Sequence, residues 1–199
     1  MPLFSQSPQQ ETDEQLMAGI KQGDTSAFDA LYMRYSKRLL NYFHRMLGGS
    51  DEKAQDFLQD IFLKLVEKPD LFDGPRFSTW IFTIAHNMCK NEYRRLSVRQ
   101  EAATQGLIAE AMTPPSSIPD QADRRLDHQT FSRALCEALQ SLGAGQRQIF
   151  LLRHQEHFSI KEISDIVGCS EGTVKSRLFY MTKKLAGKLK AFHPKAAER

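Results

Sequence analysis

The sequence predicts an all-α protein with two small helical domains joined by a flexible Pro-containing linker, the C-terminal one ending in a helix-turn-helix. Three observations lead to this prediction. Apolar residues recur at helical spacing along most of the 199 residues, and no alternating strand pattern persists. The segment TPPSSIPDQ contains three prolines, which disfavour a continuous helix and favour extended backbone. Near the C-terminus, a short turn containing glycine separates two helical patterns.

Four helices are predicted before the linker, enough to enclose one core. Gly23 and the pair Gly48-Gly49 are placed to end the first two. Ser50 can cap the third helix, and Pro69 closes it because proline cannot continue a helix. The loop PDLFDGPRF leads into the fourth. The expected helices span roughly residues 13–22, 24–47, 51–68 and 78–96.

Two more helices are predicted between the linker and the helix-turn-helix. The fifth is marked by apolar spacing from Leu126 to Leu142 and is expected to break at Gly143 and Gly145. The sixth is expected over about residues 146–155. The chain is thus divided into a disordered N-terminal tail (1–11), a first domain (12–96), the linker (97–125), a second domain (126–190) and a basic C-terminal tail (191–199).

The stretch FSIKEISDIVGCSEGTVKSRLFYMTKKL predicts the helix-turn-helix. Ser159 and Glu162 have the spacing of a capping box, in which each side chain bonds the other's backbone N–H. Gly168 is placed to take the left-handed conformation that ends a helix. Ser170 can then cap the next helix. An ordinary helical hairpin with a solvated basic face would have the same pattern.

The cap and outward face of the last helix offer side chains suited to base edges and phosphates. The candidates for duplex DNA binding are Ser170, Thr173, Lys175, Ser176, Arg177, Tyr180, Lys183 and Lys184.

Charge is distributed in blocks, although the net charge is only +3. From Thr173 to the end there are eight Lys and Arg residues against one acid, and residues 86–99 are also basic. Residues 51–73 have seven acids against three lysines. These blocks indicate polyanion binding at two places and a different partner at the third, unless each is only a solvated face.

The predicted location is the cytoplasm. The N-terminus has no basic region followed by an apolar run, so no signal peptide is expected. No stretch approaches the roughly 20 apolar residues of a membrane span, so no membrane insertion is expected. The three cysteines, Cys89, Cys136 and Cys169, are widely separated, which predicts buried free thiols in a reducing compartment.

Two motifs in the first domain suggest function. The third helix has a polar strip at three- and four-residue spacing, which could also belong to a plain acidic amphipathic helix. Its members are Asp56, Gln59, Asp60 and Leu63. The following segment interleaves aromatic and basic residues, as single-stranded nucleic acid requires for base stacking and backbone neutralisation. Its candidates are Phe72, Arg76, Phe77, Trp80, Lys90, Arg94 and Arg95; Trp80 could serve both here and in the core.

Other functional classes fit less well. A stand-alone helix-turn-helix transcriptional regulator would normally join this module to a domain with strand-helix alternation, which the first domain lacks. His154, His157 and Cys169 match no metal-binding spacing, so no metal or cofactor is expected. No nucleophile–base set or glycine-rich phosphate loop appears, so the chain is not expected to be an enzyme. A simple adaptor would leave the basic helix and the aromatic-basic segment unexplained.

The motifs AQDFLQDIFLKL, FSTWIFTIAHN and SIKEISDIVGCSEGTVKSRL, in this order, resemble a bacterial RNA polymerase sigma factor of the extracytoplasmic-function (ECF) group. The resemblance covers residues from about Thr12 to Leu189. It implies a subunit that binds core RNA polymerase, melts and recognises the −10 promoter element as single strand, and recognises the −35 element as duplex. It further implies an anti-sigma factor as a partner.

The resemblance also implies residue roles. The strip from Asp56 to Leu63 matches the main polymerase contact, and Asn87 matches a residue lining the pocket for a flipped −10 base. The loop 71–77 matches the segment that shapes this pocket, and Lys175, Ser176 and Tyr180 match positions facing −35 bases. Val66 stands where many relatives have tryptophan, and Pro75 and Tyr180 also depart from the usual pattern.

Overall fold

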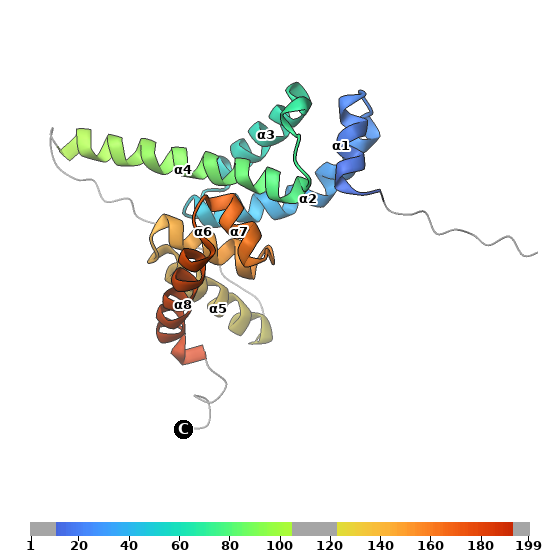
Figure 1. The fold of residues 1–199 in the computed structure, drawn as a ribbon. Helices are drawn as coiled ribbons and strands as arrows, with labels where there is room; N and C mark the ends of the chain where they lie inside the picture. Colours follow the sequence, from blue (N-terminus) through green and yellow to red (C-terminus); the bar gives the residue numbers. More distant parts are fainter. Residues whose placement is uncertain (1–10, 105–122, 193–199) are drawn as a thin grey trace, which may run out of the picture. The chain divides into compact units, whose positions relative to one another are not determined.

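The computed structural model describes residues 11–104 and 123–192 of the protein. Within these ranges the chain forms α-helices and two short 3-10 helices, and no strand, which confirms the all-α prediction (Figure 1). The α-helices are α1 (Asp13–Lys21), α2 (Thr25–Met46), α3 (Asp51–Glu67), α4 (Phe77–Thr104), α5 (Asp123–Gln140), α6 (Ala144–His154), α7 (Ile160–Val167) and α8 (Glu171–Lys188). The 3-10 helices are η1 (Pro69–Leu71) and η2 (Lys190–Phe192).

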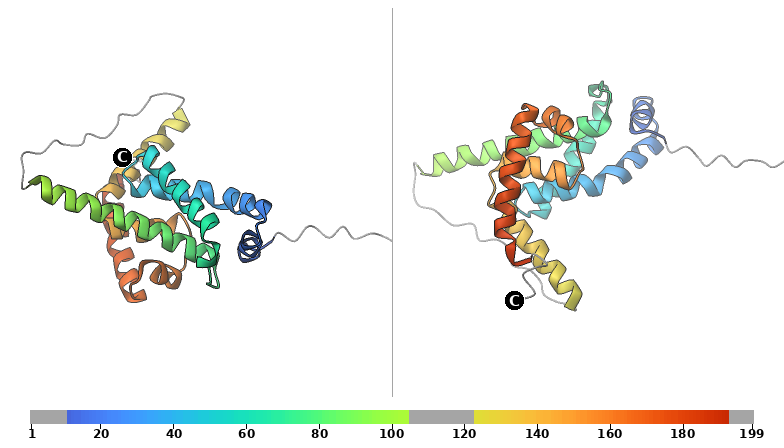
Figure 2. Two further views of the ribbon diagram at one scale, coloured as in Figure 1. Left: turned by 90° about the horizontal axis from the view of Figure 1, so that it is seen from above. Right: turned by 60° about the horizontal axis from the view of Figure 1, so that its bottom comes forward.

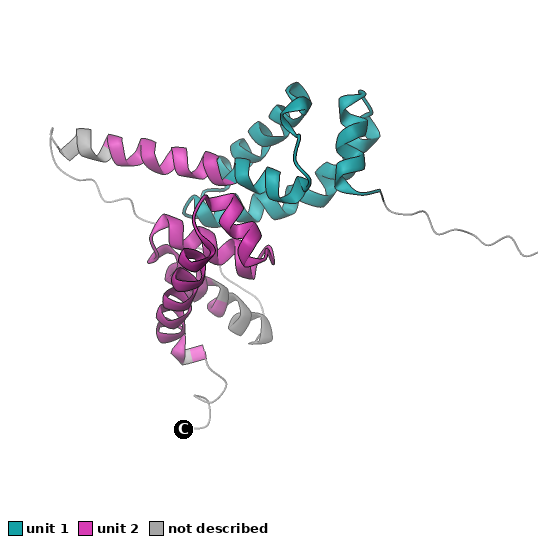
Figure 3. Ribbon diagram, in the orientation of Figure 1, with its two compact units in different colours: residues 1–85 teal, residues 86–199 magenta. Residues whose placement is uncertain are grey.

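The chain divides into two compact units, residues 1–85 and 86–199, and the division falls inside α4 (Figure 3). Helices extend into both ends of the linker that was predicted for residues 97–125. Residues 97–104 continue α4 and residues 123–125 begin α5, while residues 105–122 lie outside the described ranges. The extension of α4 follows from its composition, because SVRQEAAT contains neither Gly nor Pro and is rich in helix-forming residues. Of the predicted tails, 1–11 and 191–199, residues 1–10 and 193–199 lie outside the described residues, while residues 191–192 belong to η2.

Unit 1 is built around α2, which packs against both α1 and α3 (Figure 2). Its core contains fully buried apolar side chains from all three helices and from the start of α4, such as Met17, Leu31, Phe43, Ile61 and Phe77. Burial of each side chain of this size stabilises the folded state by about 1.5–3 kcal/mol. This burial is the main contribution that holds the helices together.

Polar contacts at the helix ends define where the elements of unit 1 begin. Thr12 and Gln15 form a capping box at α1, and the Asp24 side chain accepts hydrogen bonds from two N–H groups at α2. The predicted cap of α3 is confirmed, since Ser50 accepts from the N–H of Lys53 at 3.3 Å. Each cap satisfies donors that the first turn of a helix leaves without partners.

In unit 2, α6, α7 and α8 pack against one another (Figure 2). The predicted capping box is present: Ser159 N–H donates to Glu162 Oε2 at 2.9 Å, and Glu162 N–H donates to Ser159 Oγ at 3.2 Å. Gly168 ends α7 with φ 68°, and Ser170 caps α8. The helix-turn-helix prediction is therefore confirmed in its local chemistry.

One predicted break is wrong. Gly143 precedes α6 as its N-cap residue, but Gly145 lies in the first turn of α6 instead of interrupting the chain there. One glycine costs a helix only about 0.5–1 kcal/mol in backbone entropy, which burial of the apolar residues of α6, such as Ile149 and Leu152, outweighs. Gly145 is therefore part of α6, and the break between α5 and α6 lies before it, at residues 141–143.

All three cysteines are free thiols, as predicted, but only Cys89 is buried; Cys136 and Cys169 are partly exposed. Burial raises the pKa of the Cys89 thiol to about 12, which keeps it protonated and unreactive. None of the described helices combines the length and apolar character that a membrane span requires. Within residues 11–104 and 123–192, no group of three or more His, Cys, Asp and Glu side chains could hold a metal ion.

Candidate functional site

The first candidate surface is the outward face of α8. Val174, Met181 and Leu185 are buried against the rest of unit 2, which leaves the opposite side of the helix to solvent. Thr173, Ser176 and Tyr180 follow one another at three- and four-residue spacing and therefore share this outer face. The predicted residues Ser170, Lys175, Ser176, Arg177, Tyr180, Lys183 and Lys184 are exposed, and Thr173 is partly so.

Some of these side chains already have partners within the protein. Ser170 Oγ accepts from the N–H of Thr173 at 3.2 Å, so its first role is to cap α8. Lys175 lies 3.7 Å from the carboxylate of Glu171, an exposed ion pair that a phosphate could easily displace. Lys184 Nζ donates to the carbonyl of Ser141 at 3.1 Å, beside the end of α5. Lys184 is therefore less available to DNA than its neighbour Lys183.

A shallow apolar groove beside this face was not predicted from the sequence. It has a volume of about 500 Å³ and is lined by Arg153, His154, Leu178, Phe179, Thr182, Lys183 and Ala186. Phe179 is 65% exposed, as is the adjacent Tyr180 at 66%. The off-pattern position of this phenylalanine, outside the apolar stripe of α8, was the signal available in the sequence.

The second candidate surface lies on α3. Asp56, Gln59, Asp60 and Leu63 are all exposed and share one side of the helix, as their spacing predicted. Next to them is a groove of about 570 Å³ between α2 and α3, whose lining includes Gln59, Leu63, Tyr32 and Val66. Leu63 and Val66 are 50% and 53% exposed, so the polar strip borders an apolar surface. Tyr32 and Val66 were not among the residues predicted for this surface.

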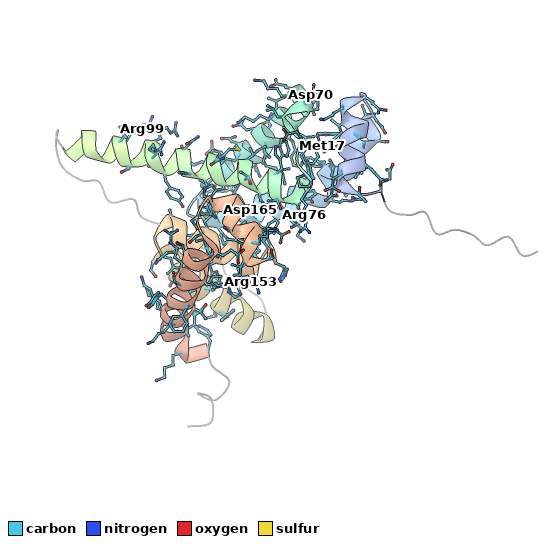
Figure 4. All side chains as sticks on the ribbon, viewed as in Figure 1. Met17, Asp70, Arg76, Arg99, Arg153 and Asp165 are labelled. Atoms are coloured by element: carbon cyan, nitrogen blue, oxygen red, sulfur yellow. The ribbon has the colours of Figure 1, made fainter. Side chains whose placement is uncertain are left out.

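The third candidate surface includes the loop before α4 and one side of that helix. Trp80, Asn87 and Arg94 are seven residues apart and so lie close to one line along α4, with Lys90 beside them. Asn87, Lys90 and Arg94 are exposed, and Trp80 is partly exposed. Arg76 is exposed at the foot of α4, and Figure 4 labels it there, with Arg99 farther along the same helix.

Two predicted aromatic residues do not have free rings. Phe77 is fully buried and Phe72 is 7% exposed, so neither can offer its face to a base. Their rings lie 5.6 Å apart, and each also contacts Trp80, at 5.4 Å from Phe72 and 5.7 Å from Phe77. The stacking role predicted for them is corrected: both rings pack against Trp80 and support its position.

Arg95 is also more occupied than the sequence suggested. Its Nε lies 2.8 Å from Glu92 Oε2, and its Nη2 donates to Glu92 Oε1 at 3.0 Å. This bidentate pair partly neutralises the guanidinium and holds it to one geometry. Arg94 is the stronger candidate for phosphate contact.

Comparison with known proteins decides the family. A model described as Sigma-70 region 2 matches residues 31–99, and a model described as Sigma-70, region 4 matches residues 132–180. The RNA polymerase sigma-H factor of Pseudomonas aeruginosa is 30% identical over 188 residues, covering 85% of this chain and 90% of that protein. The chain belongs to the sigma-70 family. The resemblance seen in the sequence is thereby confirmed.

Further relatives assign the sigma factor to the ECF group. The ECF sigma factor SigL of Mycobacterium tuberculosis is 29% identical over 171 residues, covering 85% of this chain and 92% of that protein. The ECF sigma-E factor of Escherichia coli is 27% identical over 189 residues, with coverages of 86% and 91%. As an ECF sigma factor, the protein is a transcription initiation factor for RNA polymerase and not an enzyme.

A solved structure of a sigma factor has the same fold. The sigma factor RpoE of Bartonella quintana, in complex with the anti-sigma factor NepR, matches with a TM-score of 0.65 and 25% identity, covering 83% of this chain and 98% of that one. CnrH, solved with the cytosolic domain of CnrY, matches with a TM-score of 0.65 at 24% identity and supports the fold alone. The region 2 match contains the second and third surfaces, and the region 4 match contains most of the first.

Proposed function

We propose that this sigma factor directs core RNA polymerase to promoters by recognising the −10 element as melted single strand and the −35 element as duplex. The observation that best supports this proposal is the α7–Gly168–α8 unit. A short capped helix stops at a left-handed glycine, and a second capped helix follows at once with an exposed polar and basic face. Such a unit can place one helix in the major groove while the other crosses the backbone.

For the −35 element, we assign base contacts to Lys175, Ser176 and Tyr180. Arg177 and Lys183 are assigned to phosphate contacts. Ser170 is assigned to capping α8, and its exposed side is assigned to a position near the DNA phosphates. Each base contact would contribute about 1–3 kcal/mol of discrimination. The phosphate contacts would strengthen binding to any duplex and make it sensitive to salt.

For the −10 element, we assign the loop before α4 and the line Trp80–Asn87–Arg94. Trp80 offers a partly exposed ring, Asn87 offers an amide that can both donate and accept, and Arg94 offers a cation. Extruding a base from the duplex costs a few kcal/mol, so the site must offset this cost with stacking and hydrogen bonds. Phe72 and Phe77 contribute by holding Trp80 in place.

For the polymerase, we assign the strip Asp56, Gln59 and Asp60 together with Leu63 and the adjoining apolar groove. A polar strip beside exposed apolar side chains has the character of a protein interface. The Bartonella relative was solved with an anti-sigma factor, and we propose that such a factor is also a partner of this chain. These partners imply a cytoplasmic location.

A run-off transcription assay tests the proposal. The purified chain and core RNA polymerase are incubated with templates whose upstream sequence is randomised, and the transcripts are sequenced. We expect start sites that share two elements at a fixed spacing. If no transcripts appear although the chain alone still shifts duplex DNA, the proposed recognition of two promoter elements by the polymerase-bound chain is wrong.

A further inference from the structure

The loop between α3 and α4 is held at both of its ends by α1. This loop contains η1 and residues 72–76, and it follows α1 by some fifty residues in the sequence. Lys21 Nζ, at the end of α1, donates to the carbonyl oxygen of Phe72 at 2.8 Å. Glu14 Oε1, at the start of α1, accepts from the N–H of Phe77 at 3.0 Å. One short helix therefore fixes the point where residues 73–76 leave the core and the point where they return.

The contact of Glu14 replaces a cap that the loop does not supply. The carbonyl of Arg76 accepts the first intrahelical bond of α4, from Trp80 N–H at 3.2 Å, so Arg76 occupies the N-cap position. An arginine side chain has no acceptor and cannot satisfy the free N–H groups of the first turn. Glu14 provides the missing acceptor from another helix, and its charge is favourable at a helix N-terminus.

The contact of Lys21 fixes the other end of the loop. Besides the carbonyl of Phe72, its ammonium group lies 3.7 Å from Asp70 Oδ1 in η1. The Lys21 side chain is 34% exposed, whereas that of Asp70 is 94% exposed, so the carbonyl contact is the better shielded of the two. Figure 4 labels Asp70 near this end of the loop and Arg76 at the other end.

The helix that provides both contacts is itself held firmly. Glu14, Met17 and Lys21 are spaced by three and four residues and therefore lie on one side of α1. Met17 is completely buried. On α2, Arg34 Nη1 donates to Asp13 Oδ1 at 2.7 Å, and the hydroxyl of Tyr35 donates to the same carboxylate. Because α1 cannot easily move relative to α2, its contacts can hold the loop in one conformation.

What lies between the two fixed ends is exposed. Asp73, Pro75 and Arg76 are exposed, while the flanking Phe72 and Phe77 are buried with rings 5.6 Å apart. The loop has no regular secondary structure at residues 72–76, so few of its own backbone hydrogen bonds can maintain its shape. The apolar contacts anchor its ends, and the two contacts from α1 fix the backbone at those ends.

We propose that Glu14 and Lys21 are positioning residues for −10 recognition, acting through the loop 72–77 without touching DNA. The inference rests on the proposed function, in which this loop shapes the pocket for a melted base. A base is discriminated by hydrogen bonds with narrow distance limits, so a loop free to shift would still bind single strand but would discriminate less. The expected signature is a loss of −10 selectivity with polymerase binding intact.

The test uses the full chain with core RNA polymerase on templates randomised only in the −10 element. Lys21→Met and Glu14→Ala remove the two contacts, and Lys21→Arg retains a cation that can reach a carbonyl. Lys37→Met and Glu11→Ala are matched controls, since both residues are exposed and make the same change in charge. Arg76→Ala and Trp80→Ala report whether the loop and α4 recognise the −10 element at all.

We expect Lys21→Met and Glu14→Ala each to reduce discrimination between the best and the other −10 bases by about threefold to tenfold, the effect of losing one hydrogen bond. The affinity for core RNA polymerase and the −35 preference should stay within about twofold, because the contacts that determine them do not involve this loop. Lys21→Arg should restore most of the selectivity, and the controls should match the unmodified chain. A role limited to stability would lower activity on all templates equally and leave the base preference unchanged.

Two other results overturn the inference in distinguishable ways. If Arg76→Ala or Trp80→Ala changes the −10 preference while Glu14→Ala and Lys21→Met do not, the positioning role is wrong and the proposed function stands. If none of the four changes it, the assignment of −10 recognition to this loop fails as well. Thermal unfolding checks that each variant is folded; should Glu14→Ala unfold, Glu14→Gln, which keeps the acceptor oxygen but not the charge, and Lys21→Met decide the outcome.

Discussion

At the scale of single residues, burial separates supporting positions from contacting ones. Phe72 and Phe77 have the residue type and sequence neighbourhood of a base-stacking site, yet both are buried, and partly exposed Trp80 packs against them. The sequence could not distinguish these roles, because burial depends on which helices come together and not on local spacing. Val66 shows the opposite case, since it was not predicted as a contacting residue and is 53% exposed in the groove beside α3.

His157 is a residue with an unfavourable backbone conformation. Its φ is +60°, among the described residues the only positive φ outside glycine, and it lies in the turn between α6 and α7. We predict that His157→Gly raises the free energy of unfolding by up to about 1 kcal/mol, because glycine has no Cβ to clash there. His157→Val should lower it by about 1–2 kcal/mol, since a branched Cβ is least tolerated.

Urea unfolding of the three proteins, followed by circular dichroism, measures this order. His157→Asn serves as the control, because asparagine tolerates the left-handed region and should stay close to the unmodified chain. A valine variant as stable as the glycine variant would show that the turn adopts another conformation in solution.

Ser170 allows capping to be separated from DNA contact. Its Oγ accepts from Thr173 N–H at 3.2 Å, and serine and aspartate are comparable caps. We predict that Ser170→Ala lowers the free energy of unfolding by about 1 kcal/mol, whereas Ser170→Asp preserves it. Ser170→Asp should nevertheless weaken duplex binding, because a carboxylate near the backbone repels phosphate.

Thermal unfolding and fluorescence anisotropy with a duplex containing the −35 element make the comparison. Equal DNA affinity for Ser170→Asp and the unmodified chain would show that Ser170 lies away from the phosphates and acts as a cap only. Ser176→Ala, an exposed substitution in the same helix, is the control for stability.

At the scale of elements, local chemistry was predictable where the signal lies within a few residues. The capping box of Ser159 and Glu162, the left-handed Gly168 and the cap by Ser170 were all predicted and are all present. The start of α4 was not predictable in the same way, because the acceptor for Phe77 N–H comes from Glu14, far away in the sequence. The helix α4 also extends beyond its predicted end at residue 96, because helix-forming residues continue to Thr104 although the apolar spacing weakens.

The C-terminal end of α5 depends on one arginine from α6. Arg147 is 8% exposed; its Nε donates to the carbonyl of Leu139 at 3.0 Å, and its Nη2 donates to the carbonyls of Gln140 at 3.0 Å and Leu142 at 3.4 Å. The last carbonyls of a helix lack intrahelical partners, and the guanidinium fork satisfies several at once.

We predict that Arg147→Lys lowers the free energy of unfolding by about 2 kcal/mol, because a single ammonium group cannot reach all three carbonyls. Chemical unfolding measures the change. Arg133→Lys in α5 is the matched control, since that side chain is exposed and its replacement should have little effect. A loss for Arg147→Lys no larger than for Arg133→Lys would mean that water replaces the missing donors.

At the scale of the whole molecule, the proposed surfaces differ in charge in a way that suits different partners. The strip on α3 is acidic and borders an apolar groove, whereas the faces of α4 and α8 are basic. Acidic residues would repel DNA, and basic residues would favour any polyanion, so the division limits unproductive binding. The strip on α3 and the face of α8 also belong to different compact units. A substitution in one surface should therefore leave the other nearly unaffected.

We therefore predict that polymerase binding and duplex binding can be lost independently. The triple variant Asp56→Ala, Gln59→Ala, Asp60→Ala should weaken core polymerase affinity by about tenfold or more, as expected when several contacts in one interface are removed. Its affinity for duplex DNA should not fall. Lys175→Ala should do the reverse, sparing polymerase affinity and reducing discrimination of the −35 element by about fivefold to a hundredfold, the range for one base contact.

Salt dependence separates base contacts from phosphate contacts in the same experiment. Lys183→Ala should weaken binding to every duplex alike and reduce the slope of log affinity against log salt concentration by about one, the effect of losing one phosphate contact.

Asp29→Ala, an exposed acid on α2, is the control for loss of negative charge in unit 1. Equal polymerase affinity for the triple variant, the control and the unmodified chain would contradict the α3 assignment. A Lys175→Ala variant that loses affinity for all duplexes equally would reassign Lys175 to the phosphate backbone.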